Sequence, residues 1–178
     1  MSITAFENLL STAERRNLIS GEKKTAIRLT DFVGVIPAIT GKVELVYEGE
    51  QEGADGVAMA LLGEAVKTIF DTHFPKIEKL EKQGEKGPYD EIVDWFFNTG
   101  AFNLEDDFTD KEYLDALNAI STLEVLVIDN VKDLPKKDVP FMKELVLWAL
   151  VEYEKLSKNR FTKGMLFQDP YGNLIKGL

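Results

Sequence analysis

The stretch PFMKELVLWALVEYEKL, from Pro140 to Leu156, decides the fold class of this chain. Its apolar side chains recur at intervals of three and four residues, which is the spacing of one helix face. Pro140 suits the first turn of a helix, because the N–H that proline lacks would have no partner there. We therefore predict a long helix that begins at Pro140. The side chains expected to face the core are Phe141, Leu145, Trp148, Ala149 and Leu156.

The same kind of periodicity predicts three helices upstream, over 54–74, 88–98 and 109–128. Pro88 can occupy the first turn of the second helix, and Thr109 can cap the third. The inward side chains expected are Val57, Leu61, Leu62, Ala65, Ile69 and Phe70 in the first helix, Ile92, Val93, Phe96 and Phe97 in the second, and Tyr113, Leu114, Leu117, Ile120 and Leu123 in the third.

Two further helices are predicted near the N-terminus. Thr4 and Glu7 have capping-box spacing, which predicts the start of the first helix, and Gly21 predicts its end. Its expected apolar stripe consists of Ile3, Phe6, Leu9, Leu10, Ala13 and Asn17. The second helix is expected from the N-cap Thr30 to Gly41, with a kink at Pro37. Its buried side is expected to contain Phe32, Val35, Ile36 and Ile39.

The pattern changes after these helices. Residues 43–48 are rich in β-formers and partly alternate, which predicts an extended segment before an acidic loop at 48–53. Near the C-terminus, 165–168 and 173–176 flank a turn sequence and predict a small hairpin. We therefore expect a mainly α fold: a bundle of about five to six helices, a short extended segment near 43–48 and a C-terminal β-hairpin.

Composition excludes several classes of function. The chain has 178 residues, a net charge of -10, no cysteine and one histidine, so disulfides, thiolate metal sites and a cysteine nucleophile are ruled out. Acidic charge argues against nucleic acid as a partner. We also expect no membrane partner and a cytosolic location, because no apolar run of spanning length and no signal peptide are visible. The charge is uneven: residues 1–30 hold five basic and three acidic side chains, which leaves -12 for the remainder.

Few residues of the sequence indicate a chemical function. Gly41 and Lys42 match the Gly-Lys pair of a phosphate-binding loop, but Val43 stands where a hydroxyl must hold magnesium. The acidic cluster at 103–110 is interpreted as charge near a helix N-terminus, and His73 as a capping or surface histidine.

Arg15 and Arg16 could reach a phosphate or an acidic partner, and they form the candidate basic face of the chain. Adjacent helical residues point about 100° apart, so at most one of them faces a given ligand. The alternative, which the sequence favours, is that both are solvated charges in the C-terminal half of a helix.

A run of residues resembles the C-terminal part of magnesium-chelatase-subunit-I-like AAA+ ATPases, which are relatives of the MoxR group. The most specific element is PAITGKVELVYEGE, residues 37–50, and the resemblance covers about 2–75. The matching residues are Ile3-Thr4, Glu7-Asn8-Leu9, Ser11 to Arg16, Gly21-Glu22, Arg28, Asp31-Phe32 and Val35 to Gly53.

In that family a Walker-containing core precedes a helical lid. The resemblance therefore implies that this chain begins inside the lid helix, just after the sensor-2 arginine, as a fragment or a stand-alone remnant. It implies a lid-like portion at 1–42, an acidic hinge at 43–53 and a C-terminal helical domain at 54–178. ATP and Mg are implied only for the missing core, and this chain is expected to hold no catalytic, cofactor-binding or metal-binding residue.

The implied role is mechanical: the chain passes ATP-driven motion to the AAA+ core, a neighbouring subunit or a von Willebrand factor A type protein. The residues expected at the hinge or contact surface are Pro37, Thr40, Gly41, Lys42, Glu44, Tyr47, Glu50 and Glu52. Two alternatives stay open. One is a stand-alone acidic helical module for protein–protein interaction. The other is a small acid/base enzyme, which would need a pocket containing a carboxylate of perturbed pKa.

Overall fold

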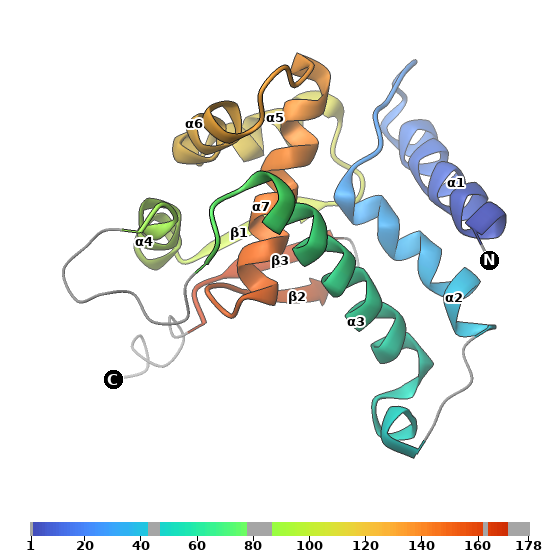
Figure 1. Ribbon diagram of the computed structural model, residues 1–178. Helices are drawn as coiled ribbons and strands as arrows, with labels where there is room; N and C mark the ends of the chain where they lie inside the picture. The colour runs from blue at the N-terminus through green and yellow to red at the C-terminus, as the bar shows by residue number, and fades with distance from the viewer. Residues whose placement is uncertain (1, 43–46, 78–86, 162–163, 171–178) are drawn as a thin grey trace.

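The computed structural model describes residues 2–42, 47–77, 87–161 and 164–170 (Figure 1). Within these ranges the chain is mainly helical with a small antiparallel sheet, which confirms the expected fold class. In chain order the elements are α1 (Ser2–Ser20), the 3-10 helix η1 (Leu29–Val35), α2 (Ile36–Thr40), α3 (Tyr47–His73), α4 (Asp90–Thr99), β1 (Ala101–Glu105), α5 (Asp110–Asn118), α6 (Ser121–Asn130), the 3-10 helix η2 (Lys136–Asp138), α7 (Val139–Glu152), β2 (Ser157–Phe161) and β3 (Gly164–Gln168).

Helix α7 lies at the centre of the molecule (Figure 1). Every side chain from Met142 to Leu150 is buried, which is the pattern of a helix enclosed on all sides. Helices α3, α5 and α6 and strand β2 pack around it. The expected start is confirmed, since Pro140 stands in the first turn. Leu156 is buried as expected, but it lies beyond the end of the helix.

The sheet has the strand order β1-β3-β2, and both pairs are antiparallel. The predicted strand at 165–168 is confirmed within β3. Its partners are different from the one expected: β3 pairs with β2 and with β1, while 173–176 lies outside the described residues. β1 was not expected, because its alternation covers only five residues, of which Phe102 and Leu104 turn into the core.

The helix expected over 109–128 is two helices. Thr109 is the N-cap of α5 as predicted, and its hydroxyl accepts a hydrogen bond from the Glu112 N–H at 3.2 Å. The chain then breaks at Ile120, whose φ and ψ are -100° and 78°. This break places the fully buried Ile120 side chain in the core and lets α6 pack against α7. Local periodicity continues through this position, so the sequence pattern did not reveal the break.

Several helices bury only part of the face expected to point inward. In α1, Leu9 and Ala13 are buried as expected and Arg16 is buried beside them, because this helix packs on η1 and α2 rather than on the main core. The helix also begins at Ser2, so the Thr4–Glu7 pair lies inside it and does not cap it. Expected core residues that are instead exposed are Ile3, Phe6, Leu10, Leu61, Ala65, Ile69, Phe97 and Leu114.

The region around Pro37 is two short elements rather than one kinked helix. η1 ends at Val35, and α2 starts at Ile36 with Pro37 in its first turn, where proline removes no hydrogen bond. Arg28, not Thr30, is the residue that precedes η1. Val35 and Ile39 are buried as expected.

The acidic segment also differs from its prediction. Residues 43–46 lie outside the described part of the chain, and Tyr47 already belongs to α3. This helix is interrupted at Gly53, where φ is 73° and ψ is 164°. Glycine tolerates such a positive φ without steric cost. The helix predicted from Ala54 therefore follows this break.

The buried side chains form two clusters. The larger one surrounds α7, and a smaller one joins Leu9, Val35, Ile39 and Ala58 from α1, η1, α2 and α3. The division into 1–42, 43–53 and 54–178 stays a prediction. Within the described ranges, no helix has both the length and the apolar content needed to cross a bilayer.

Candidate functional site: a buried polar network

Arg16 and Asp31 form a buried two-point ion pair between α1 and η1. The Arg16 Nε atom donates to Oδ1 of Asp31 at 3.1 Å, and Nη2 donates to Oδ2 at 2.9 Å. Both side chains are 4% exposed. Arg16 also donates to the Thr25 hydroxyl at 2.6 Å and to the Ala26 carbonyl at 2.7 Å. Such a paired geometry fixes both the position and the orientation of α1 on η1.

Arg28 extends this network to α5. Its backbone N–H donates to Oδ2 of Asp31 at 2.8 Å, and its Nη2 atom donates to Oδ1 of Asp110 at 3.0 Å. The guanidinium carbon lies 4.2 Å from the centre of the Tyr113 ring, within the range of a cation–π contact. Arg28 is 2% exposed. These contacts join the start of η1 to the first turn of α5.

Glu144 joins the same region to α7. Its side chain is fully buried, and its carboxylate accepts hydrogen bonds from the Leu29 N–H at 2.8 Å, the Thr30 N–H at 2.9 Å and the Tyr113 hydroxyl at 2.7 Å. Burial raises the pKa of Glu144 to about 7, against the lowering effect of these three hydrogen bonds. Burial, followed by the charge of Glu144, raises the pKa of Tyr113 well above its usual value.

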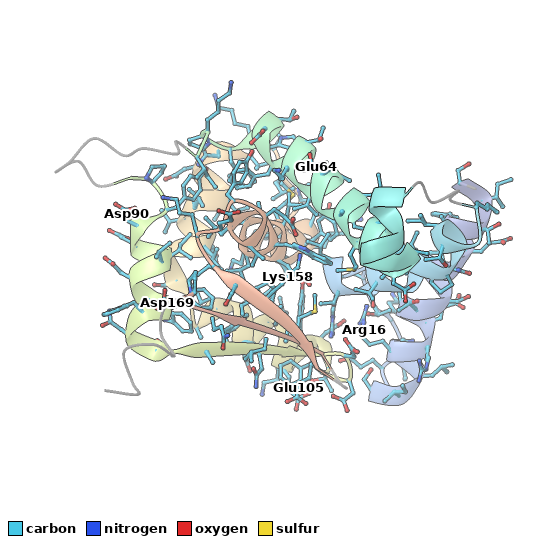
Figure 2. The ribbon with its side chains drawn as sticks, turned by 90° about the horizontal axis from the view of Figure 1, so that it is seen from below. Arg16, Glu64, Asp90, Glu105, Lys158 and Asp169 are labelled. Atoms are coloured by element: carbon cyan, nitrogen blue, oxygen red, sulfur yellow. The ribbon has the colours of Figure 1, made fainter. Side chains whose placement is uncertain are left out.

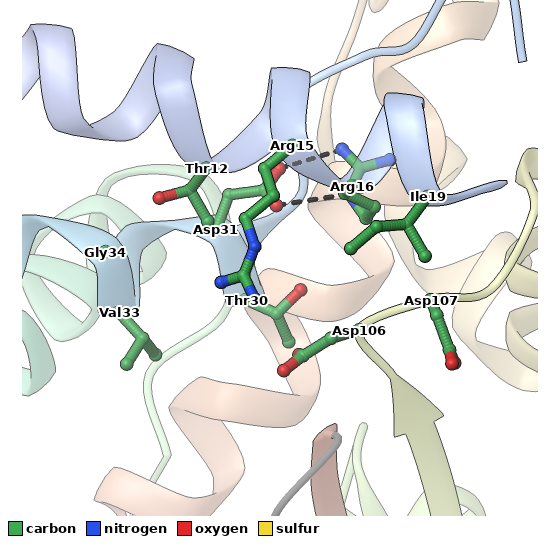
Figure 3. A pocket seen from close by; sticks show the side chains of 10 residues that line it. All are labelled: Thr12, Arg15, Arg16, Ile19, Thr30, Asp31, Val33, Gly34, Asp106 and Asp107. Atoms are coloured by element: carbon green, nitrogen blue, oxygen red, sulfur yellow. Dashed lines mark hydrogen bonds and ion pairs between the residues drawn. The ribbon is translucent and has the colours of Figure 1, made fainter. Parts of the chain in front are cut away.

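An open pocket of about 510 Å³ lies beside the Arg16–Asp31 pair, which forms part of its lining (Figure 3). It is bounded by α1, by η1 and by the chain that follows β1. The lining residues are Thr12, Arg15, Arg16, Ile19, Thr30, Asp31, Val33, Gly34, Asp106 and Asp107. Glu144, the carboxylate whose pKa is raised, is absent from this lining. The alternative of a small acid/base enzyme therefore gains no support from this pocket and stays a hypothesis.

A second polar cluster connects α7 with β2. Lys158 lies beneath α7 (Figure 2), and it donates to the Glu152 carboxylate. Its Nζ atom stands 4.2 Å from the centre of the Trp148 ring. The Trp148 Nε1 atom also donates to Glu152, at 3.1 Å. Burial lowers the pKa of Lys158, against the raising effect of Glu152.

The two arginines of the expected basic face have different environments. Arg15 is exposed and lines the pocket, whereas Arg16 is buried in its ion pair (Figure 3). The basic face is therefore not one surface, and Arg16 is not a solvated charge. The reason is the 100° turn between neighbouring helical residues, which directs Arg16 toward Asp31. His73 is exposed in the last turn of α3, as expected.

The expected hinge residues fall on two segments. Pro37 and Thr40 lie in α2, Gly41 is its C-cap residue, and Lys42 is exposed just beyond it. On the second segment, Tyr47, Glu50 and Glu52 belong to the part of α3 that precedes Gly53, and Glu44 lies outside the described residues. Pro37, Thr40, Gly41 and Lys42 take no part in the described contacts of the polar network.

The network residues other than Arg16 were missed as site residues by the sequence reasoning: Arg28, Asp31, Asp110, Tyr113 and Glu144. One signal for Glu144 was available. It stands beside Lys143 within an otherwise apolar run, and a buried carboxylate is rare unless it is paired. No comparable signal marks Asp110, since the chain is rich in carboxylates.

No group of three or more histidine or acidic side chains within the described ranges is arranged to hold a metal ion. Comparison of the chain with protein families, with curated proteins and with solved structures gave no match in any of the three.

Proposed function

We propose that this chain is the lid and helical extension of a magnesium-chelatase-like AAA+ ATPase, in which it transmits motion and performs no chemistry. The observation that carries this proposal is the polar bridge from α1 and η1 to α5 and α7, which is buried at Arg16, Asp31, Arg28 and Glu144 and partly exposed at Asp110. Arg16, Asp31, Arg28 and Asp110 form one continuous chain of ion pairs and hydrogen bonds across it.

The physical properties of the bridge suit a mechanical role. Removal of one partner of a buried ion pair leaves an uncompensated charge in a medium of low dielectric constant, which costs several kcal/mol. Small displacements of α1 are therefore passed on to α5 rather than absorbed at the contact. A flexible, solvated contact between the same helices would dissipate such a displacement.

The proposal also assigns partners. ATP and Mg bind to the AAA+ core, and the chain contacts that core, neighbouring subunits and a von Willebrand factor A type protein. A cytosolic location belongs to the same proposal. The pivot lies on the two segments around 37–42 and 47–53, where Gly53 interrupts α3 with a positive φ.

The first test is to read the codons upstream of Met1. In-frame Walker A and Walker B sequences support the proposal, whereas a stop codon with a separate ribosome-binding site contradicts it. The purified chain should not hydrolyse ATP. Turnover that survives purification and disappears when residues of this chain are changed would also contradict it.

The second test examines coupling in the full-length ATPase. Asp110→Asn weakens the bridge between Arg28 and α5, so we expect ATP hydrolysis by the core to continue while partner-dependent work falls. Asp129→Asn is the matched control, because Asp129 is an exposed carboxylate on α6. Equal effects of the two variants on partner-dependent work would exclude a transmitting role for the bridge.

One observation favours the second candidate, a stand-alone interaction module. Helix α1 exposes large apolar side chains: Ile3 is 74%, Phe6 59% and Leu18 80% exposed. Scattered apolar residues are normal at a surface, but a helix that exposes several of them suits a binding partner. The upstream codons separate this candidate from the first.

A further inference from the structure

Glu144 is a carboxylate that connects two parts of the molecule from a fully buried position. It projects from the middle of α7 to the first two residues of η1, where it meets the N–H groups of Leu29 and Thr30. It also meets the hydroxyl of Tyr113 on α5. Three elements thus converge on one titratable group, and no water-exposed surface remains on it.

The surroundings of Glu144 can accommodate either protonation state. When it is ionised, Glu144 accepts all three hydrogen bonds. When it is protonated on Oε2, it can donate to the Tyr113 oxygen, because the Tyr113 hydroxyl has a second acceptor, the Pro140 carbonyl oxygen, 3.5 Å away. The two N–H groups of η1 keep their acceptors in both states. The site can therefore take up a proton without leaving a buried donor unpaired.

We propose that Glu144 is a proton-linked latch that holds η1 against α5 and α7, and that loss of its proton favours opening of the latch. Opening means that η1 moves away from α7, so that water reaches the carboxyl group. This property belongs to the chain by itself and does not depend on the assignment to an ATPase.

The direction of this pH effect follows from the difference in the pKa of Glu144 between the closed and open states. Burial raises the pKa of Glu144 to about 7 in the closed state, from an ordinary value of 4.5. In the open state the hydrated carboxyl group returns to its ordinary value. The closed state therefore binds the proton more tightly. Its extra stability is complete below pH 4.5 and is lost as the pH rises to about 7.

The other charged groups around Glu144 do not reverse the direction of this pH effect. Asp31 on η1 raises its pKa further by like-charge repulsion. Arg28 lies over the Tyr113 ring and pairs with Asp110 of α5. Tyr113 stays neutral in the same pH range, because its own pKa is raised.

Two other groups require attention. Lys143, the neighbour of Glu144 on α7, bonds instead to Asn118 and Glu124. His73 is the single histidine, and it lies exposed at the end of α3. Histidine is the residue type most often used as a switch near neutral pH, so His73 is given its own control variant.

The test is amide hydrogen exchange of Leu29 and Thr30, measured by NMR at about pH 5 and about pH 8 and corrected for the intrinsic exchange rate. We expect the protection of these two amides to fall roughly 10- to 100-fold between the two conditions. Glu144→Gln, a neutral side chain of the same shape, should abolish that pH dependence. His73→Asn should leave it intact.

Protection that does not change with pH in the unmodified chain would overturn the latch. So would a full pH dependence in Glu144→Gln, or its loss in His73→Asn. If Glu144→Gln does not fold, the carboxyl ¹³C titration of Glu144 in the unmodified chain decides the question. A midpoint near 7 supports the proposal, and a midpoint near the ordinary 4.5 overturns it.

A second variant probes the site itself. The Tyr113 hydroxyl lowers the pKa of Glu144 by hydrogen bonding to its charged form. Tyr113→Phe removes this bond and should move the titration midpoint upward, together with the pH at which protection is lost. A midpoint that stays in place or moves downward would show that the described hydrogen bond does not set the proton affinity, and would count against the latch.

Discussion

Gly63 of α3 lies directly beneath the carboxylate of Glu152 in α7, so close that a Cβ atom at position 63 would stand 2.7 Å from the Glu152 Cδ atom. The absence of a side chain at Gly63 is what lets Glu152 lie against α3 while it accepts hydrogen bonds from Lys158 and Trp148. Two helices that are far apart in the sequence are thus fitted together at a single glycine.

Gly63→Ala should therefore be destabilising, although alanine is intrinsically about 1 kcal/mol better than glycine inside a helix. The methyl group displaces the Glu152 carboxylate from Lys158, and the lost charged hydrogen bond costs about 1.5–3 kcal/mol. Urea unfolding of Gly63→Ala in the unmodified chain and in a Glu152→Ala background separates the two effects. In the second background the substitution should become neutral or stabilising; identical changes in both would contradict this contact.

Gly34→Ala should be destabilising for a related reason. A Cβ at Gly34 would meet the Thr12 hydroxyl oxygen and would stand 3.0 Å from its Cβ, where α1 crosses η1. Overpacking of this kind costs about 1–3 kcal/mol, which thermal unfolding can measure. Thr12→Ala should recover part of the loss. Gly41→Ala is the control: its φ is -72°, and the nearest atom is 3.8 Å away. A similar cost at both glycines would argue against the close approach.

Arg16→Met should be strongly destabilising and Arg15→Met nearly neutral. Arg16→Met leaves the carboxylate of Asp31 buried without its partner, at a cost of about 3–5 kcal/mol. Arg15 is exposed, so its replacement should change the free energy of unfolding by no more than about 0.5 kcal/mol. If Arg16→Met is too unstable to measure, addition of Asp31→Asn should restore part of the stability. Similar unfolding midpoints for the two single variants would refute the buried pair.

Thr109→Ala should weaken the start of α5. The Thr109 hydroxyl accepts from the Glu112 N–H, and the Glu112 carboxylate accepts from the Thr109 N–H at 2.8 Å. Loss of an N-cap of this kind costs about 1 kcal/mol in urea unfolding. Thr109→Ser keeps the hydroxyl and should keep most of the stability. Thr99→Ala, at the exposed end of α4, should have little effect. A loss in Thr109→Ser as large as in Thr109→Ala would show that the hydroxyl is not the cap.

Local signals predicted those features that depend on neighbouring residues alone. Pro140 in the first turn of α7, Thr109 as the N-cap of α5 and Gly21 after α1 are all correct, because each acts on backbone groups within a few residues. The buried faces of the helices were predicted less well. In the predicted stripe of α1, Leu9 and Ala13 are buried, whereas Ile3 and Phe6 are exposed because this helix packs only on η1 and α2.

The candidate site could not be predicted, because its contacts join residues far apart in the chain. Arg16 pairs with Asp31, Arg28 pairs with Asp110, and Glu144 accepts from Leu29 across 115 residues. In so acidic a chain many carboxylates could have paired with either arginine, and spacing does not choose among them.

The sequence by itself determined that the chain is mainly helical and that Pro140 stands in the first turn of its last long helix. Periodicity and capping are local properties, so they can be read from the residues in order. The tertiary structure alone decided that Arg16 is buried, that β1 joins the sheet and that Glu144 is a shared acceptor. The cost of burying a charge depends on which partners the fold brings within hydrogen-bond distance.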